Sequence, residues 1–139
     1  MKLNPNHIFI DTNVLNGVYL NKTADVECLQ YLFSLKGKKL FISSLSIGQF
    51  VAFFHEKFTN EKIKDIIRYF FTKFTIIEFT DKDIQKSLLF DYSDLEDTIQ
   101  YVIGTKLKCF YFVTNDKHFT TFLNINALKS TEVRSIKKL

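Results

Sequence analysis

Two segments of the sequence place a carboxylate shortly after an apolar run. Residues 8–10 lead directly into Asp11, and residues 110–113 are followed shortly afterwards by Asp116. Apolar runs of this kind are typical of strands buried in a parallel sheet, and open α/β sheets bind ligands beyond the carboxyl ends of their strands. The two acids are therefore predicted to meet at one edge of a sheet. A helix cap would explain Asp11 alone equally well.

A third group of acids, at residues 94–97, lies in a helix predicted to precede the second of these strands. Asp94 and Asp97 share a face of that helix, whereas Glu96 is expected to point away from Asp97 by roughly 100°. Carboxylates that converge repel one another unless a cation lies between them. Oxygen ligands without His or Cys favour Mg²⁺ or Mn²⁺ over zinc. Such a site suits phosphodiester chemistry, although capping would explain one acid here.

The elements that must position these acids alternate along the chain. Strands are expected at 8–11, 40–43, 74–79 and 109–114, and helices at 14–20, 24–35, 44–58, 61–73, 81–90, 95–107 and 117–123. Asn60 is expected to cap the fourth helix, and Ser93 or Asp94 the sixth. Residues 127–139 are expected to hold an edge strand and a last helical turn. Alternation of this kind predicts an α/β domain with a parallel sheet and helices on both faces, formed by residues 1–139 as a single domain.

The composition excludes some classes of protein. Of 139 residues, 46% are apolar, so a disordered chain is excluded, and the net charge of +4 is compatible with a polyanionic partner without being evidence for one. The sequence contains neither a signal peptide nor an apolar stretch near the ~20 residues of a membrane span, which predicts a cytoplasmic protein. Cys28 and Cys109 are isolated and expected to be buried, reduced thiols. His7, His55 and His118 accompany no nucleophile motif and are expected to be ordinary surface or core residues.

Three blocks of the sequence, at residues 8–13, 94–100 and 112–119, resemble signature segments of the PIN-domain family in their order and spacing. Together they extend over almost the whole chain. The resemblance implies a three-layer α/β/α sandwich with a central parallel sheet. It also implies a metal-dependent ribonuclease of the kind found among VapC-like toxins of toxin–antitoxin pairs.

Carried over by position, the resemblance assigns roles to particular residues. The catalytic, metal-binding acids would be Asp11, Asp97 and Asp116, with Thr12, Asn13, Thr114 and Asn115 in support. The basic residue placed best to contact RNA is Lys117, which follows Asp116 directly.

The sequence departs from the family pattern at one acid. The segment 43–49 aligns with the family's Ser-rich lead-in, but Gln49 stands where the family has a Glu. Gln49 keeps a carbonyl oxygen and loses a charge, which is expected to weaken metal binding. Gln49 and Asp94 are therefore predicted to be auxiliary ligands, with Asp94 restoring part of the charge.

Two functions follow from this sequence. The first is a Mg²⁺- or Mn²⁺-dependent endoribonuclease that hydrolyses RNA phosphodiester bonds, as the toxin of a type II toxin–antitoxin pair. Its expected partners are RNA, an antitoxin protein and a second copy of the chain. The alternative, motivated by Gln49, is a catalytically weakened or inactive PIN-like module that binds RNA or protein.

Overall fold

A computed structural model describes residues 2–92 and 94–137 of the chain. Within these residues, parallel strands form one sheet in the order β3-β2-β1-β4-β5. The strands are β1 (Asn4–Ile10), β2 (Lys39–Ser43), β3 (Thr75–Ile77), β4 (Cys109–Val113) and β5 (Asn126–Leu128). The predicted parallel sheet is therefore confirmed, with β1 at its centre.

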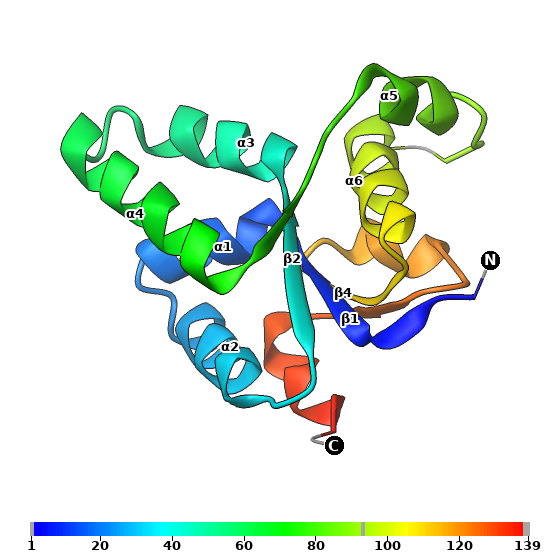
Figure 1. The fold of residues 1–139 in the computed structure, drawn as a ribbon, viewed down its shortest axis with the longest axis horizontal. Helices are drawn as coiled ribbons and strands as arrows, with labels where there is room; N and C mark the ends of the chain where they lie inside the picture. The colour runs from blue at the N-terminus through cyan, green and yellow to red at the C-terminus, as the bar shows by residue number, and fades with distance from the viewer. Residues whose placement is uncertain (1, 93, 138–139) are drawn as a thin grey trace.

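Helices cover both faces of the sheet, as Figure 1 shows. One face carries α1 (Thr12–Tyr19), α2 (Thr23–Ser34), α3 (Ser44–Phe54), α4 (Asn60–Lys73) and the 3₁₀ helix η2 (Ser130–Ser135). The other carries α6 (Leu95–Lys106) and the 3₁₀ helix η1 (Lys117–Thr121), with α5 (Asp81–Ser87) packed against α6. This arrangement is the three-layer α/β/α sandwich that the sequence predicts.

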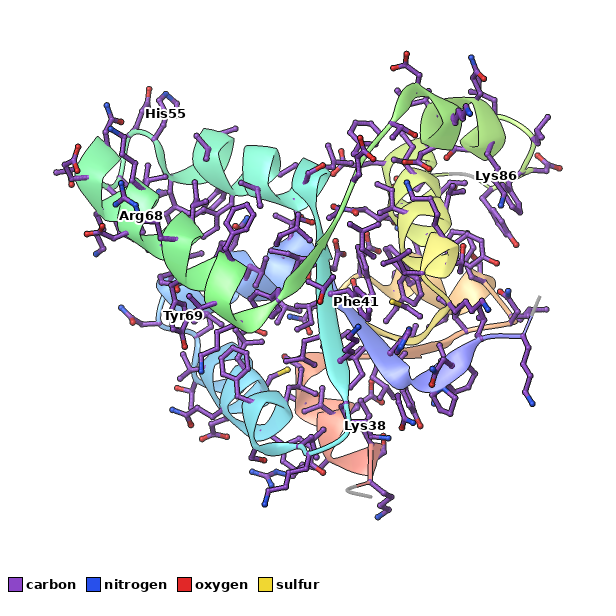
Figure 2. All side chains as sticks on the ribbon, in the orientation of Figure 1. Lys38, Phe41, His55, Arg68, Tyr69 and Lys86 are labelled. Carbon is purple, nitrogen blue, oxygen red and sulfur yellow. The ribbon has the colours of Figure 1, made fainter. Side chains whose placement is uncertain are left out.

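The apolar run of β1 is explained by burial on both faces. Ile8 and Ile10 belong to the core beneath α1–α4, whereas Phe9 belongs to the core beneath α6, and all three are completely buried. A strand that alternates between two cores needs an apolar residue at every position. In β2, Phe41 is likewise buried in the core beneath α6. It lies at the middle of the molecule in Figure 2, whereas Arg68 and Lys86 lie at the margins.

Several predicted boundaries were wrong. The first strand begins at Asn4 rather than residue 8, because the Asn4 amide donates to the Lys108 carbonyl (2.7 Å) and extends the pairing with β4. The third helix ends at Phe54, whose carbonyl then accepts turn bonds, rather than at residue 58. Thr59, not Asn60, caps α4, since its side chain accepts the Lys62 amide (3.2 Å).

Other differences lie around α5 and α6. The strand predicted at 74–79 is shorter because the Phe79 amide donates to the Ser44 hydroxyl (3.0 Å) instead of to a neighbouring strand. The helix predicted to reach residue 90 ends at Ser87. Asp94 caps α6, and the other expected cap, Ser93, lies outside the described residues.

Cys28 and Cys109 are buried free thiols, as predicted. Among residues 2–92 and 94–137, the structure contains no helix with the length and apolar character needed to cross a bilayer.

Close packing of α6 on the sheet makes Gly104 a sensitive position. A Cβ at Gly104 would overlap the Phe112 ring and lie 3.2 Å from Phe9 Cδ2. Gly104→Ala is therefore expected to lower the free energy of unfolding by about 1 to 3 kcal/mol, measured by urea denaturation. The matched control is Gly48→Ala, because a Cβ there meets nothing within 4 Å, and this variant should gain about 0.5 to 1 kcal/mol. Equal effects of the two substitutions would contradict this packing.

Candidate active site at the carboxyl edge of the sheet

A cleft of about 510 Å³ opens at the carboxyl edge of the sheet, beyond the ends of β1, β2 and β4. Its walls are formed by Asp11, Thr12, Asn13, Asn16, Gln49, Ala52, Phe53, Glu96, Asp97, Gln100 and Asp116. The structure thus brings together at one cleft the acids that the sequence singles out from three separate segments. Parallel strands make this possible because all of them end at the same edge.

Asp11 is held by hydrogen bonds to both carboxylate oxygens. Its Oδ1 accepts the Thr12 amide (2.8 Å), so Asp11 caps α1 as well as facing the cleft. Its Oδ2 accepts from the Thr114 hydroxyl (2.8 Å) and from Asn13 Nδ2 (3.0 Å). Burial raises the pKa of Asp11 to about 6, although the bonds from Thr114 and Thr12 oppose that shift. Thr12, Asn13 and Thr114 thus each donate a hydrogen bond to Asp11.

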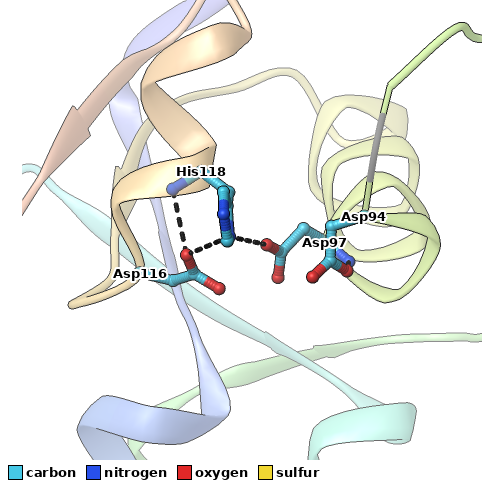
Figure 3. Close-up of side chains that lie close together, drawn as sticks. All are labelled: Asp94, Asp97, Asp116 and His118. Atoms are coloured by element: carbon cyan, nitrogen blue, oxygen red, sulfur yellow. Dashed lines mark hydrogen bonds and ion pairs between the residues drawn. The ribbon is translucent and has the colours of Figure 1, made fainter.

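Asp116 lies opposite α6, next to His118 (Figure 3). Its Oδ1 accepts the His118 amide (2.9 Å) and lies 2.9 Å from the ring nitrogen Nδ1, which is also 3.8 Å from Asp97 Oδ2. One ligand-capable atom from each of Asp94, Asp97, Asp116 and His118 fits within 4.8 Å of the others. The expectation that His118 is an ordinary surface residue missed this position. The available signal was its spacing, two residues after Asp116.

Asp97 differs from the other acids in its hydrogen bonding. Its Oδ2 is buried and has no hydrogen-bond partner among the described residues. Burial, the hydrogen bond with Asp116 and the charges of Asp116, Asp94 and Asp11 raise the pKa of Asp97. Burial acts in the same direction on Asp116, but hydrogen bonds from the His118 amide and from Asp97 outweigh it and lower the pKa of Asp116.

This donor set fits a divalent cation. A buried carboxylate oxygen without a donor is costly, and a cation between the acids would remove both that cost and their repulsion. Asp11, Asp97 and Asp116 offer oxygen atoms, which Mg²⁺ and Mn²⁺ prefer.

Gln49 faces the cleft but makes bonds that sequence reasoning did not predict. Its Oε1 accepts from the Thr12 hydroxyl (2.5 Å), and its Nε2 donates to Glu96 Oε1 (2.8 Å). Glu96 was expected to point away from Asp97, yet it lines the same cleft and accepts the hydrogen bond from Gln49 on α3. Asp94, by contrast, does not line this cleft, and its Oδ1 accepts the Asp97 amide (2.9 Å).

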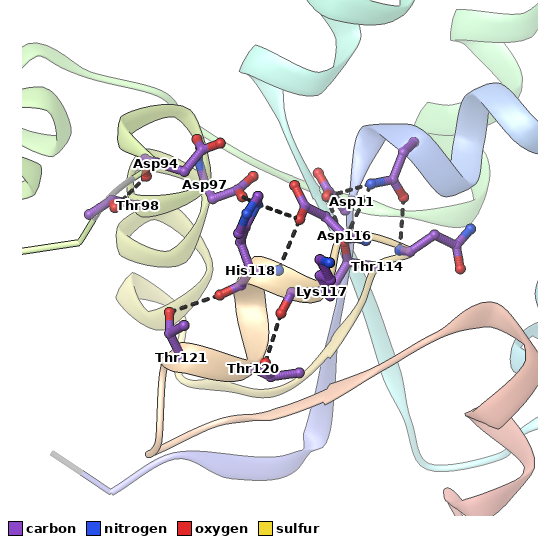
Figure 4. A network of polar contacts seen from close by, with 12 residues as sticks. Asp11, Asp94, Asp97, Thr98, Thr114, Asp116, Lys117, His118, Thr120 and Thr121 are labelled. Atoms are coloured by element: carbon purple, nitrogen blue, oxygen red, sulfur yellow. Dashed lines mark hydrogen bonds and ion pairs between the residues drawn. The ribbon is translucent and has the colours of Figure 1, made fainter.

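The remaining predicted residues lie around the loop after β4. The Asn115 amide donates to Asn13 Oδ1 (3.1 Å), while its side chain bridges Asp25 (3.0 Å) and the Ser130 amide (3.1 Å). Asn115 therefore holds the loop instead of lining the cleft. Lys117 is exposed at the start of η1, beside Asp116 (Figure 4).

The raised pKa values predict a dependence of stability on pH in the absence of metal. A carboxyl whose folded pKa exceeds its unfolded value near 3.9 contributes most stability at low pH, and that contribution is lost as the pH rises through the folded pKa. The free energy of unfolding in EDTA should therefore fall from about pH 4 to beyond about pH 6, the pKa of Asp11.

Asp97→Asn should relieve part of this repulsion and raise the free energy of unfolding in EDTA at pH 7 by about 1 to 2 kcal/mol. Asp65 is exposed on α4 and ion-paired with Arg68 (2.8 Å), so Asp65→Asn serves as control, with an expected change below about 0.5 kcal/mol. Thermal and urea denaturation measure both. A destabilised Asp97→Asn protein at pH 7 would show that this carboxylate is not strained.

No family model matches the chain. Ribonuclease VapC1 of Aquifex aeolicus (strain VF5) is 27% identical over 126 residues, which are 84% of this chain and 86% of that protein.

Solved structures share the fold at lower identity. A toxin–antitoxin complex from Klebsiella pneumoniae matches with a TM-score of 0.68 and 16% identity, over 90% of this chain and 98% of that chain. Mycobacterium tuberculosis VapC20, a sarcin–ricin loop cleaving toxin, matches with a TM-score of 0.67 and 13% identity. The match covers 85% of this chain and 96% of VapC20. VapBC2 from Rickettsia felis, bound to a promoter DNA fragment, matches with a TM-score of 0.64 and 16% identity. The match covers 88% of this chain and 98% of that chain. The predicted resemblance is thus confirmed: the chain is similar in sequence to Ribonuclease VapC1 and has the fold of these solved structures.

Proposed function

We propose that this protein is a divalent-metal-dependent endoribonuclease and the toxin of a toxin–antitoxin pair, acting in the cytoplasm. The observation that carries the proposal is the convergence of Asp11, Asp97 and Asp116 on one cleft, where a buried Asp97 oxygen lacks a donor. Similarity to a protein named as a ribonuclease supports the same chemistry.

Asp11, Asp97 and Asp116 would hold Mg²⁺ or Mn²⁺. When bound, such an ion stabilises the negative charge that develops on a phosphodiester under in-line attack by water. Thr114 and Asn13 fix the orientation of the Asp11 carboxylate through its Oδ2. His118 fixes Asp116 in the same way, through its amide and its ring.

The cleft also offers a surface on which RNA could be oriented. Phe53 lies in the cleft wall with 43% of its surface exposed. The buried Phe54 ring supports it edge-on, with 4.8 Å between ring centroids, and Lys57 Nζ lies 5.6 Å from the Phe53 centroid. Exposed aromatic rings beside basic residues stack nucleobases and hold phosphates. We therefore assign Phe53 to base stacking and keep Lys117 as a phosphate contact.

The proposed partners follow from the relatives. The chain covers 98% of the matching chain in Rickettsia felis VapBC2 and 98% of the matching chain in the toxin–antitoxin complex from Klebsiella pneumoniae. Residues 1–139 are accordingly proposed to act as one domain, which binds an antitoxin protein and pairs with a second copy of itself.

Asp11→Asn is expected to lower the rate of RNA cleavage at least about 100-fold while the protein stays folded, because a central ligand of the site is lost. A fluorogenic single-stranded RNA, assayed with Mg²⁺, Mn²⁺ or EDTA, measures the rate, and circular dichroism checks the fold. The exposed Asp65→Asn protein is the control and should cleave normally. Unchanged cleavage by Asp11→Asn would refute the site assignment. A wild-type protein that binds RNA and cleaves none with either metal would favour the inactive binding module instead.

Phe53→Ala is expected to weaken RNA binding about 5- to 30-fold, the loss of one base-stacking contact, and to leave Mn²⁺ affinity unchanged. The matched control is Phe71→Ala, since Phe71 is 63% exposed on α4 and is not among the residues that line the cleft. Fluorescence anisotropy of a labelled oligonucleotide with the Asp11→Asn protein as background measures the affinity. Equal losses from both substitutions would remove Phe53 from the RNA-binding surface.

A further inference from the structure

We propose that Glu96 supplies the fourth carboxylate of the cleft and that Gln49 is its positioning residue. This proposal rests on the metal-dependent function proposed above. In this arrangement, Glu96 in the first turn of α6 provides the negative charge that Gln49 on α3 lacks. Glu96 can replace the Glu expected at position 49 because it lines the same cleft and contacts Gln49 from α6.

The direction of the Gln49 amide follows from its neighbours. Gln49 Oε1 accepts from the Thr12 hydroxyl and from Gln100 Nε2 (3.3 Å), while Nε2 donates to Glu96 (2.8 Å). Turning the amide over would bring its oxygen against the Glu96 carboxylate and its nitrogen against Gln100 Nε2, and both contacts would be repulsive. The amide is therefore fixed with its nitrogen toward Glu96.

The orientation of the Gln49 amide determines which side chain can coordinate a cation. Gln49 Oε1 already accepts hydrogen bonds from Thr12 and Gln100, so the group that Gln49 presents to Glu96 is its N–H donor. One N–H uses one acceptor site of the Glu96 carboxylate, which leaves the remaining sites free for a cation. A Glu at position 49 could not make this contact, because two carboxylates would then face each other. The amide at Gln49 and the acid at Glu96 are thus complementary.

A second feature of the cleft points to a cation beside Glu96. Asp97, the next residue, lines the same cleft, is 8% exposed, and carries the buried Oδ2 without a partner among the described residues. Both acids lie in the first turn of α6, where the helix dipole favours negative charge. Asp94 lies near Asp97, Asp116 and His118 but does not line this cleft, whereas Glu96 does. Glu96 is therefore the further carboxylate that the cleft itself places with Asp11, Asp97 and Asp116.

The test is the affinity of the full-length protein for Mn²⁺, measured by calorimetry after removal of metal with EDTA. Glu96→Gln is expected to weaken Mn²⁺ binding at least about 10-fold, within the range for residues that support a metal site. Glu56→Gln removes the same charge from an exposed position beyond the end of α3 and is expected to change the affinity less than twofold. The exchange Gln49→Glu/Glu96→Gln keeps the charge and the hydrogen-bonded pair, so it should recover affinity to within about threefold of wild type.

The possible outcomes separate this proposal from the function it rests on. If Asp97→Asn abolishes Mn²⁺ binding while Glu96→Gln stays within twofold of wild type, Glu96 is not part of the site and only this proposal fails. If the exchange binds no better than Glu96→Gln although both proteins melt like wild type in EDTA, the pairing of Gln49 with Glu96 is refuted. If the wild type binds no Mn²⁺ at millimolar concentration, the metal-dependent function fails as well.

Discussion

Repulsion among carboxylates held at the carboxyl edge of the sheet is the constraint on which this structure depends. Asp11 and Asp97 are both buried, and burial raises the pKa of each, with further increases from the charges of neighbouring carboxylates. Such an arrangement lowers stability at neutral pH, so a fold that keeps it must offset the cost elsewhere. Asp11 and Asp116 follow β1 and β4, and Asp97 lies on α6. These elements provide that compensation because they pack into the apolar cores on the two faces of the sheet.

The same constraint explains how the acids are supported. Asp11, Asp94 and Asp116 each cap a helix or a 3₁₀ helix, so backbone N–H groups offset part of their charge. The capping explanation and the functional one, which looked like alternatives in the sequence, are therefore compatible. Asp97 differs because its Oδ2 lacks a partner within the described part of the chain. A bound cation would satisfy it.

Much of the fold and part of the cleft could be predicted from the sequence because the signals are local. The apolar run that ends at Asp11 and the similar run before Asp116 identify two strands and, through the parallel sheet, their shared edge. Glu96 could not be predicted in this way. Its contact with Gln49 joins residues 47 positions apart and depends on how α3 and α6 are placed across the cleft. His118 was missed for a similar reason, since its proximity to Asp97 arises from the packing of η1 against α6.

The central claim is that these carboxylates form one divalent-metal site. The most direct test is a crystal structure of the wild-type protein with Mn²⁺, with anomalous diffraction recorded on either side of the manganese absorption edge. This account predicts an anomalous peak in the cleft, within ligand distance of carboxylate oxygens of Asp11, Asp97 and Asp116. A well-ordered cleft without such a peak, in crystals saturated with Mn²⁺, would contradict it.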